Sequence, residues 1–247
     1  MYFKLRGLRS ATSVLGAATA VAVLSACSGA PSSSPIVPKQ PVQSSSSHAL
    51  ELSNQLETLG PADGLDDAIK CHGQNLIQDG NFETPVLPAG QGQYFDVGTT
   101  LGPWTVTGPP GDAVALLTST TMDGGYTFNA QSGVQSVDLT VLPNGPAGLA
   151  QTVNLQKNHR YSLCFSVGNV KNPGGVLGRK STDIVEVDGH RIFTARNSLG
   201  IPNSGVVAWK KFRTTIVGAG GPMTISFNNG DRVRDNYNGL DSVELVP

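Results

Sequence analysis

The chain has 247 residues, with 17 Lys and Arg against 18 Asp and Glu, a formal net charge of −1 and only 14% charged residues. A near-neutral chain without a long basic run lacks the usual signature of nucleic-acid binding, so we expect no nucleic-acid partner. The length is enough for one sizeable domain in addition to short terminal segments.

Residues 1–27 combine the parts of a bacterial lipoprotein signal peptide. Three basic residues precede an uncharged apolar stretch at residues 11–24. That stretch is shorter than the ~20 residues that cross a bilayer as a helix, which favours a signal peptide over a membrane anchor. Residues 24–27 read LSAC and match a lipobox. We therefore expect cleavage after residue 26 and lipid attachment at Cys27.

The signal peptide would export the protein, and a lipid on Cys27 would anchor it to the bacterial cell membrane or outer membrane, with the rest of the chain outside the cytoplasm. Ser28, rather than Asp, follows the cysteine, which favours the outer membrane in a cell that has two. An ordinary signal peptide with a chance cysteine and a short membrane anchor are the alternatives.

Residues 27–73 have the composition of a tether between the lipid and a folded domain. Residues 28–48 are rich in Ser and Pro, which is typical of a flexible and partly extended linker. Apolar residues at 49–59 follow helical spacing and predict one short helix.

The remainder, residues 74–247, has the pattern of an all-β domain. Several short segments are apolar at alternate positions or rich in β-branched residues, as expected of strands. These segments lie at residues 134–141, 149–155, 161–167, 185–187, 223–227 and 243–245. Asp188-Gly189 predicts a hairpin turn. Short strands between clusters of Gly, Pro and Asn predict an antiparallel β-sandwich or jelly roll of about 170 residues.

Two cysteines remain once Cys27 is assigned to lipid. An exported protein meets an oxidising compartment, so Cys71 and Cys164 are expected to form one disulfide. Two unpaired thiols, with Cys164 buried in a strand, are the alternative. The spacing of Cys and His residues does not indicate a zinc site.

Four motifs occur in a characteristic order over residues 75–246. They are NLIQDGNFE at 75–83, GPWTV at 102–106, HRYSL at 159–163 and YNGLDSV at 237–243. This order resembles the choice-of-anchor C family of bacterial exported proteins. It is also similar to plant cell-wall proteins classed as a domain of unknown function, and to β-sandwich carbohydrate-binding modules. The resemblance implies a galactose-binding-like jelly roll that binds polysaccharide without cleaving it. Cys164 and the segment 171–181 depart from the family pattern.

The same resemblance implies a structural calcium ion. In the related modules, the Glu of the opening motif and the Asp of the closing motif help to bind calcium, and Glu83 and Asp241 occupy those positions here. Calcium takes six to eight oxygen ligands, which suits paired carboxylates. The alternative is that both carboxylates accept hydrogen bonds from backbone amides at strand ends.

Sugar binding needs flat aromatic surfaces beside polar groups. Tyr126 and Tyr237 lie in Gly-rich or Asn-rich segments, where binding residues concentrate. Trp104 is a further candidate, although a tryptophan in the GPWTV motif more often belongs to the core. The polar candidates near Tyr237 are Arg234, Asp235, Asn236 and Asn238. Their alternative role is local turn chemistry.

Signals for catalysis are weak, and we expect no catalytic residues. The sequence contains neither GxSxG nor HExxH. Asp183, Glu186 and Asp188 could supply paired acids for glycoside hydrolysis, but the last two read as the solvated face of a hairpin. We therefore predict a lipid-anchored, non-catalytic polysaccharide-binding module. The alternatives are an envelope protein that binds another protein or has a structural role, and, more remotely, a cryptic glycoside hydrolase.

Overall fold

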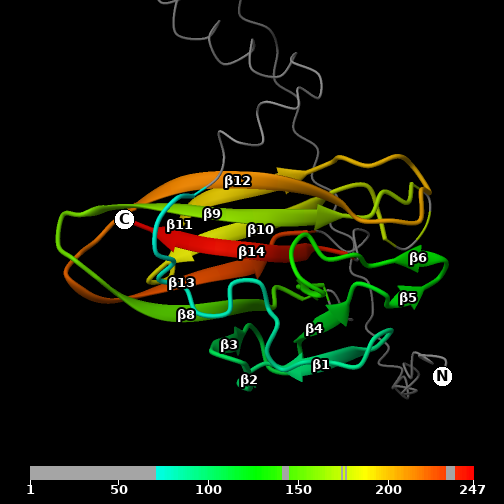
Figure 1. Ribbon diagram of the computed structural model, residues 1–247, viewed down its shortest axis with the longest axis horizontal. Helices are drawn as coiled ribbons and strands as arrows, with labels where there is room; N and C mark the ends of the chain where they lie inside the picture. The colour runs from blue at the N-terminus through cyan, green and yellow to red at the C-terminus, as the bar shows by residue number, and fades with distance from the viewer. Residues whose placement is uncertain (1–70, 141–144, 174, 176, 232–236) are drawn as a thin grey trace, which may run out of the picture. The chain divides into compact units, whose positions relative to one another are not determined.

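The computed structural model describes residues 71–140, 145–173, 175, 177–231 and 237–247 (Figure 1). They belong to one compact unit, Asp63–Pro247. The predicted signal peptide, Cys27, residues 28–70 of the tether and the short helix at 49–59 lie outside the described residues, so these predictions stay untested. Within the described part of the chain, no helix is long and apolar enough to cross a membrane.

The described residues form strands connected by turns and loops. In chain order the strands are β1 (Gly92–Asp96), β2 (Thr100–Leu101), β3 (Trp104–Thr107), β4 (Ala113–Thr118), β5 (Met122–Asp123), β6 (Tyr126–Thr127), β7 (Gln135–Asp138), β8 (Gly148–Leu155), β9 (Arg160–Asn169), β10 (Ser181–Val187), β11 (His190–Asn197), β12 (Ala208–Val217), β13 (Gly221–Asn229) and β14 (Gly239–Val246).

Two six-stranded sheets make up the domain. Sheet A has the order β1-β4-β7-β14-β9-β12, sheet B has the order β11-β10-β13-β8-β3-β2, and β5 and β6 pair separately. Neighbouring strands in both sheets are antiparallel. From β8 onward the chain repeatedly crosses between the sheets, so the two layers are built together as in a jelly roll. The prediction of an all-β antiparallel sandwich is confirmed.

Alternation along the strands decides which side chains fill the space between the sheets. On β9, Leu163, Phe165 and Val167 are buried in the core. Trp104 of β3 is fully buried there too, with its ring centroid 5.4 Å from that of Phe82. Because the two inner faces interdigitate, the opposite face of each strand is left for solvent or for a ligand.

The predicted turn at Asp188-Gly189 is confirmed as the link between β10 and β11. Both residues have positive φ, 50° for Asp188 and 74° for Gly189. Such a conformation suits a tight hairpin turn and is tolerated by Asp and Gly. The Asp188 carboxylate accepts the Thr224 amide at 2.8 Å, which ties the turn to β13.

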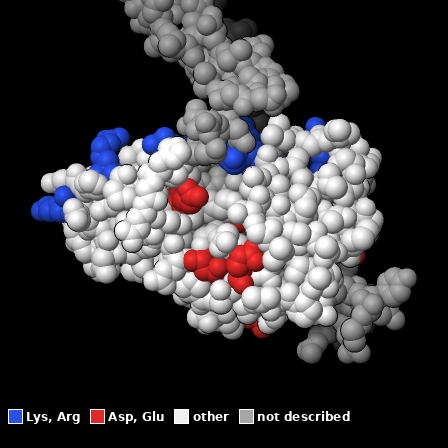
Figure 2. All heavy atoms as spheres, in the orientation of Figure 1, with Lys and Arg blue, Asp and Glu red and all other residues white. Residues whose placement is uncertain are grey.

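The topology gives the sandwich two unlike edges. Strands β11 and β12 end their sheets on one side, where the Phe193 and Phe212 rings meet across the seam at 6.2 Å. Strands β1 and β2 end the sheets on the other side (Figure 1). In the face shown in Figure 2, Lys and Arg side chains gather along the β12 side, whereas most of the remaining surface is uncharged.

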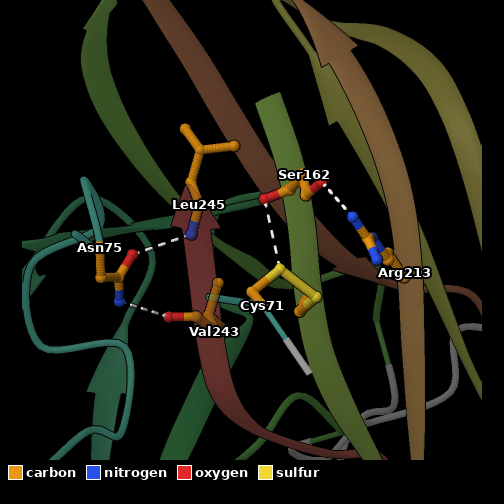
Figure 3. The surroundings of a disulfide bond; sticks show 7 residues. Cys71, Asn75, Ser162, Arg213, Val243 and Leu245 are labelled. Atoms are coloured by element: carbon orange, nitrogen blue, oxygen red, sulfur yellow. Dashed lines mark hydrogen bonds between the residues drawn. A yellow bond between two sulfur atoms is a disulfide. The ribbon is translucent and has the colours of Figure 1, made fainter. Parts of the chain in front are cut away.

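The disulfide between Cys71 and Cys164 is present, with the two Cα atoms 6.0 Å apart (Figure 3). It ties the start of the domain to β9. Four residues later, the Asn75 amide donates to the Val243 carbonyl at 3.1 Å, and its oxygen accepts the Leu245 amide at 2.8 Å. The first segment of the domain is therefore fixed to both β9 and β14.

Candidate functional site

An open groove of about 690 Å³ lies on the outer face of sheet B. Its floor comes from β3, β8 and β13, and one wall comes from the segment that follows Asn75. The lining residues are Leu76, Gln78, Pro103, Thr105, Thr107, Ala150, Gln151, Thr152, Val153, Asn154 and Thr224. The groove therefore crosses three neighbouring strands of one sheet.

Strand alternation explains why the floor of the groove is polar. On β8, Val153 belongs to the core, so its neighbours Thr152 and Asn154 point outward and are exposed. On β3, Trp104 and Val106 point inward in the same way, which leaves a threonine on the outer face at positions 105 and 107. Small and polar side chains thus face the solvent over the middle of the sheet.

Cross-strand pairs and one buried amide give the groove its shape. Thr152 and Thr224 are opposite each other on β8 and β13, with their hydroxyl oxygens 2.8 Å apart. Gln151 is buried, donates to the Gln78 carbonyl at 2.9 Å and accepts the Gln78 amide at 2.8 Å. This two-way bond holds the wall segment against the sheet. Ala150, which has a small side chain, also lines the groove.

The chemistry available in the groove is neutral hydrogen bonding. Hydroxyl groups donate and accept, and an amide side chain offers two donors and an acceptor. The lining residues include no Asp, Glu, His or Cys, and no aromatic ring. Such a surface can bind a neutral polar molecule rich in hydroxyl groups, but it supplies no acid or base for a reaction. Sequence reasoning missed the groove, although the alternation of Thr and Asn with apolar residues on β3 and β8 signals it.

The predicted aromatic binding residues lie elsewhere. Trp104 is fully buried, and its indole nitrogen donates to the Asp79 carbonyl at 3.0 Å. Tyr237 is also fully buried and packs against Phe128, with ring centroids 5.1 Å apart. Neither ring has a face free to stack on a sugar. The prediction treated both as possible ligand contacts because exposure cannot be read from a motif.

Tyr126 and Tyr237 belong to a second apolar cluster, away from the groove. It contains Phe128, Val170, Val207 and Tyr237, with Tyr126, Leu117, Leu177 and Trp209 packed against it. A Cβ atom on Gly168 would lie 2.9 Å from the Trp209 ring. Gly168 follows the inward-facing Val167, so this cluster covers the outer face of sheet A. The half-buried Tyr126 hydroxyl lies in a hydrogen-bonded network with Asn172 and Asn203.

The polar residues predicted near Tyr237 fall into two groups. Asn238 is fully buried, and its amide donates to the Thr182 carbonyl at 2.8 Å and to Asn229 at 3.2 Å. It therefore holds strand ends together and has no surface for a ligand. Arg234, Asp235 and Asn236 lie outside the described residues, so their role stays a prediction.

The acids considered for hydrolysis do not share a cleft. Asp183 is fully buried, and burial together with the neighbouring Asp231 carboxylate raises its pKa well above the usual range. Glu186 points to the outer face of sheet B, where it accepts the Asn228 amide at 3.2 Å. Asp188 lies in the hairpin turn. The sheet itself separates Asp183 from Glu186.

The Glu83 and Asp241 carboxylates both accept hydrogen bonds from backbone amides of residues 131–135. Glu83 accepts the amides of Val134 at 2.7 Å and Gln135 at 3.0 Å. Asp241 is fully buried and accepts the amides of residues 131 and 132 at 2.7 and 2.9 Å. The alternative considered from the sequence, hydrogen bonding to backbone amides, is therefore the arrangement in this structure.

Burial controls the charge of Asp241. Desolvation raises the pKa of its carboxyl to about 7, the amides of Ser132, Ser242 and Gln131 lower it, and the nearby Glu83 carboxylate raises it. Two carboxylates supply at most four of the six to eight oxygens that calcium takes. Among the residues that the structure describes, no group of three or more His, Cys, Asp and Glu suits a metal ion. A cation here would depend on backbone carbonyls or water for its other ligands.

Several solved structures resemble the chain. TmCBM61, solved in complex with β-1,4-galactotriose, is 17% identical with a TM-score of 0.44, covering 70% of this chain and 98% of that one. The K2 adhesin domain of Lys-gingipain is 12% identical with a TM-score of 0.41, covering 68% and 96%. A family 35 carbohydrate-binding module from Clostridium thermocellum is 11% identical with a TM-score of 0.35, covering 63% and 97%. Likenesses this distant carry no argument about the ligand.

A match to a family model, unlike the distant structural likenesses, assigns the chain to a protein family. No curated protein matches the sequence. The choice-of-anchor C resemblance stays a prediction, because the family model that matches has another description. This model covers residues 75–237, which is more than half of the chain and includes the groove's strands. The chain therefore belongs to the family described as protein of unknown function (DUF642).

Proposed function

We propose that the sandwich binds a polysaccharide in the groove on the outer face of sheet B and does not cleave it. The observation that carries this proposal is an open groove lined by hydroxyl and amide groups, with no carboxylate among its lining residues. A glycan presents many hydroxyl groups that need directional donors and acceptors. The order of motifs that resembles carbohydrate-binding modules supports the same ligand class.

The direction of the groove suits an extended chain. Strands in a sheet lie about 4.8 Å apart, so a groove across β3, β8 and β13 spans more than one sugar ring. The open form admits an internal segment of a polymer as well as its end. Glycoside hydrolysis, in contrast, requires a pair of carboxyl groups about 5–10 Å apart across the bound sugar.

The test uses affinity electrophoresis of the full chain against plant and bacterial polysaccharides. We expect retardation on at least one glycan without release of reducing ends. Thr152→Ala with Asn154→Ala removes two exposed polar side chains from the floor. Losing one or two neutral hydrogen bonds of about 1 kcal/mol each should weaken binding roughly tenfold.

The matched control is Gln93→Ala with Thr215→Ala, which removes two exposed polar side chains from strands of sheet A. It should bind like the wild type. Equal retardation of the groove variant and the wild type would place the ligand elsewhere. Release of reducing ends by the wild type, but not by a mock preparation, would contradict the non-catalytic assignment.

We also propose that a lipid on Cys27 holds the domain at the bacterial envelope. The lipobox at residues 24–27 supports this anchor. Each buried methylene contributes ~0.8 kcal/mol, so several acyl chains on one residue hold a protein stably. The Cys27→Ser variant should move from the membrane fraction to the soluble fraction and lose the lipid mass, whereas Ser28→Ala should stay. Wild-type protein without lipid would refute the anchor.

We propose calcium as a structural ligand of Glu83 and Asp241. Its support is the pair of carboxylates converging on residues 131–135. A divalent cation there would offset the desolvation and, to a smaller extent, the repulsion from Glu83 that together raise the pKa of Asp241. The ion would then staple the opening segment of the domain to β14.

One feature favours a protein partner as the second candidate. The loop before β12 exposes Leu199, Ile201 and Val206, with Ile201 75% exposed. This loop reaches the β5–β6 hairpin, because Val206 bridges Thr127 and the Thr127 amide donates to the Gly205 carbonyl at 2.7 Å. An exposed apolar patch is typical of a protein contact. If no glycan retards the wild type, this patch becomes the better candidate site.

A further inference from the structure

Basic residues are segregated along the chain. All twelve Lys and Arg residues after Cys71 occur from Lys157 onward, and none lies in the 85 residues between. Acidic residues are segregated as well: no Asp or Glu occurs from residue 189 to residue 230. A chain that is nearly neutral overall thus carries a locally basic segment, which includes β11 and β12.

The fold gathers this segment on one edge of the sandwich. Strands β11 and β12 are the last strands of sheets B and A on the same side. The Phe212 ring lies 5.7 Å from Phe165 and 6.2 Å from Phe193, which closes the seam between the sheets. Lys210 lies over the same ring, with its Nζ atom 5.2 Å from the centroid.

Four exposed cations on these two strands define what we call the basic edge: Arg191, Arg196, Lys210 and Arg213. Two of these side chains donate hydrogen bonds to neutral hydroxyl groups. Arg191 donates to the Thr194 hydroxyl at 2.9 Å, and Arg213 donates to the Ser162 hydroxyl at 2.7 Å. The charges of these side chains therefore remain available to an anionic partner. In Figure 2 the Lys and Arg side chains gather along the β12 side of the molecule.

The acidic groups near this edge are few. Glu186 is opposite Arg191 in the β10–β11 register and accepts the Asn228 amide. Asp188 accepts the Thr224 amide in the turn. Arg213 on β12 and Glu244 on β14 are both in register with Cys164 of β9, which lies between these strands. The two charged residues are therefore two strands apart. Each lies at the border of the basic edge, and the strands β11 and β12 themselves contain no acid.

The outer face of sheet B connects the groove to the basic edge. One row of cross-strand partners runs through Thr105, Ala150, Ser226, Glu186 and Arg191. Cross-strand partners share a face of the sheet, so this row runs along one surface. Four steps between strands cover roughly 19 Å. A polymer that lies in the groove and crosses the strands would therefore pass Glu186 and reach Arg191.

We propose that the ligand is an acidic polysaccharide, rich in uronic acid, whose carboxylates contact the basic edge while its hydroxyl groups occupy the groove. This inference rests on the proposed polysaccharide binding and adds the charge of the ligand. Arg binds carboxylates in a planar, two-pronged geometry, which suits such a partner. Electrostatic attraction of this kind strengthens selection between similar ligands.

Polygalacturonate and its fully methyl-esterified form are the probes, because they share one backbone and differ in charge. The full chain is run in affinity electrophoresis on each polymer. Arg191→Gln with Arg196→Gln should weaken retention on polygalacturonate about tenfold at low salt, since each exposed ion pair contributes up to ~1 kcal/mol. Retention on the esterified polymer should not change. Salt at about 1 M should abolish the difference, because it screens charges beyond a few ångströms.

Lys157→Gln with Lys171→Gln is the matched control, since it removes two positive charges outside the basic edge. Thermal melting confirms that all variants are folded. Equal retention of the wild type on both polymers refutes the inference but leaves polysaccharide binding intact. Retention on neither polymer nor any other glycan refutes both. Binding to phosphatidylglycerol vesicles without retention on polygalacturonate would assign the basic edge to an anionic membrane and overturn the inference.

Discussion

A variant with Cys71→Ala and Cys164→Ala is expected to lose about 4–5 kcal/mol of unfolding free energy. The disulfide joins residues separated by 93 positions in the sequence. In the chain-entropy model, a cross-link that closes a loop of this length restricts the unfolded state by roughly that amount. Such a loss is a large share of the 5–15 kcal/mol that stabilises a typical domain.

Removing the disulfide should also loosen the first segment of the domain in the folded state. The disulfide brings Cys71 to β9, and the following residues then pair with β14 through the Asn75 side chain and the Leu76 amide, which donates to Leu245 at 2.8 Å. Without the cross-link this segment is held by those hydrogen bonds, by the Gln78–Gln151 pair and by the packing of Ile77 in the core. Because Gln78 also forms the groove wall, glycan binding should weaken together with stability.

Denaturant unfolding of the oxidised wild type, the reduced wild type and the double variant measures the contribution. The reduced wild type and the double variant should coincide, and reductant should not affect the variant. A loss below about 1 kcal/mol would show that the unfolded chain is already restricted or that the chain-entropy estimate does not apply.

The strands that sequence patterns identify best are those with one apolar face. The alternating residues of β9 and β13 and the turn at Asp188-Gly189 appear in the structure as predicted. Short strands such as β1 and β2 escaped prediction because they offer too few residues for a clear alternation, and β1 is largely exposed and pairs with the more distant β4. The segment predicted as a strand at 134–141 is shorter in the structure, where β7 is Gln135–Asp138.

The binding residues were harder to predict, and the reason is physical. A loop tyrosine reads as exposed, but Tyr237 is fully buried in the second apolar cluster with Phe128, and Trp209 packs against that cluster. The groove, in contrast, uses ordinary Thr and Asn residues that become a site only when β3, β8 and β13 are adjacent. Local sequence reports which face of a strand is polar, but strand order decides which polar residues meet.

The folded domain is expected to lose stability as the pH rises from 5 to 8. Burial raises the pKa of Asp241 to about 7, against an ordinary value of 3.8. The folded state therefore binds the proton more tightly than the unfolded state. This stabilisation is complete below the ordinary pKa and is lost as the pH rises through about 7. One pKa unit corresponds to about 1.4 kcal/mol, so a few kcal/mol depend on this group.

A second carboxyl group should act in the same direction. Burial also raises the pKa of Asp138 to about 7, although its amide and hydroxyl partners, Asn238 and Thr140, lower it. Asp138 is half-buried as a residue, whereas Asp241 is fully buried, so we expect a smaller contribution than from Asp241. Thermal melting at pH 5 and pH 8 compares the wild type with Asp241→Asn and Asp138→Asn. The difference between the two pH values should shrink most in Asp241→Asn, and an unchanged difference in both variants would refute the role of these groups.

Calcium should reverse the loss of stability at high pH if it binds at Glu83 and Asp241. The ion requires ionised carboxylates, so it competes with the proton and is most effective above the pKa of Asp241. Millimolar calcium should raise the melting temperature of the wild type at pH 8 and have little effect at pH 5. Glu83→Gln keeps an oxygen for the Val134 and Gln135 amides but removes a ligand charge, so its calcium response should vanish. A wild type that melts identically in calcium and in chelator at pH 8 would contradict the calcium site, while the pH dependence would stand on its own.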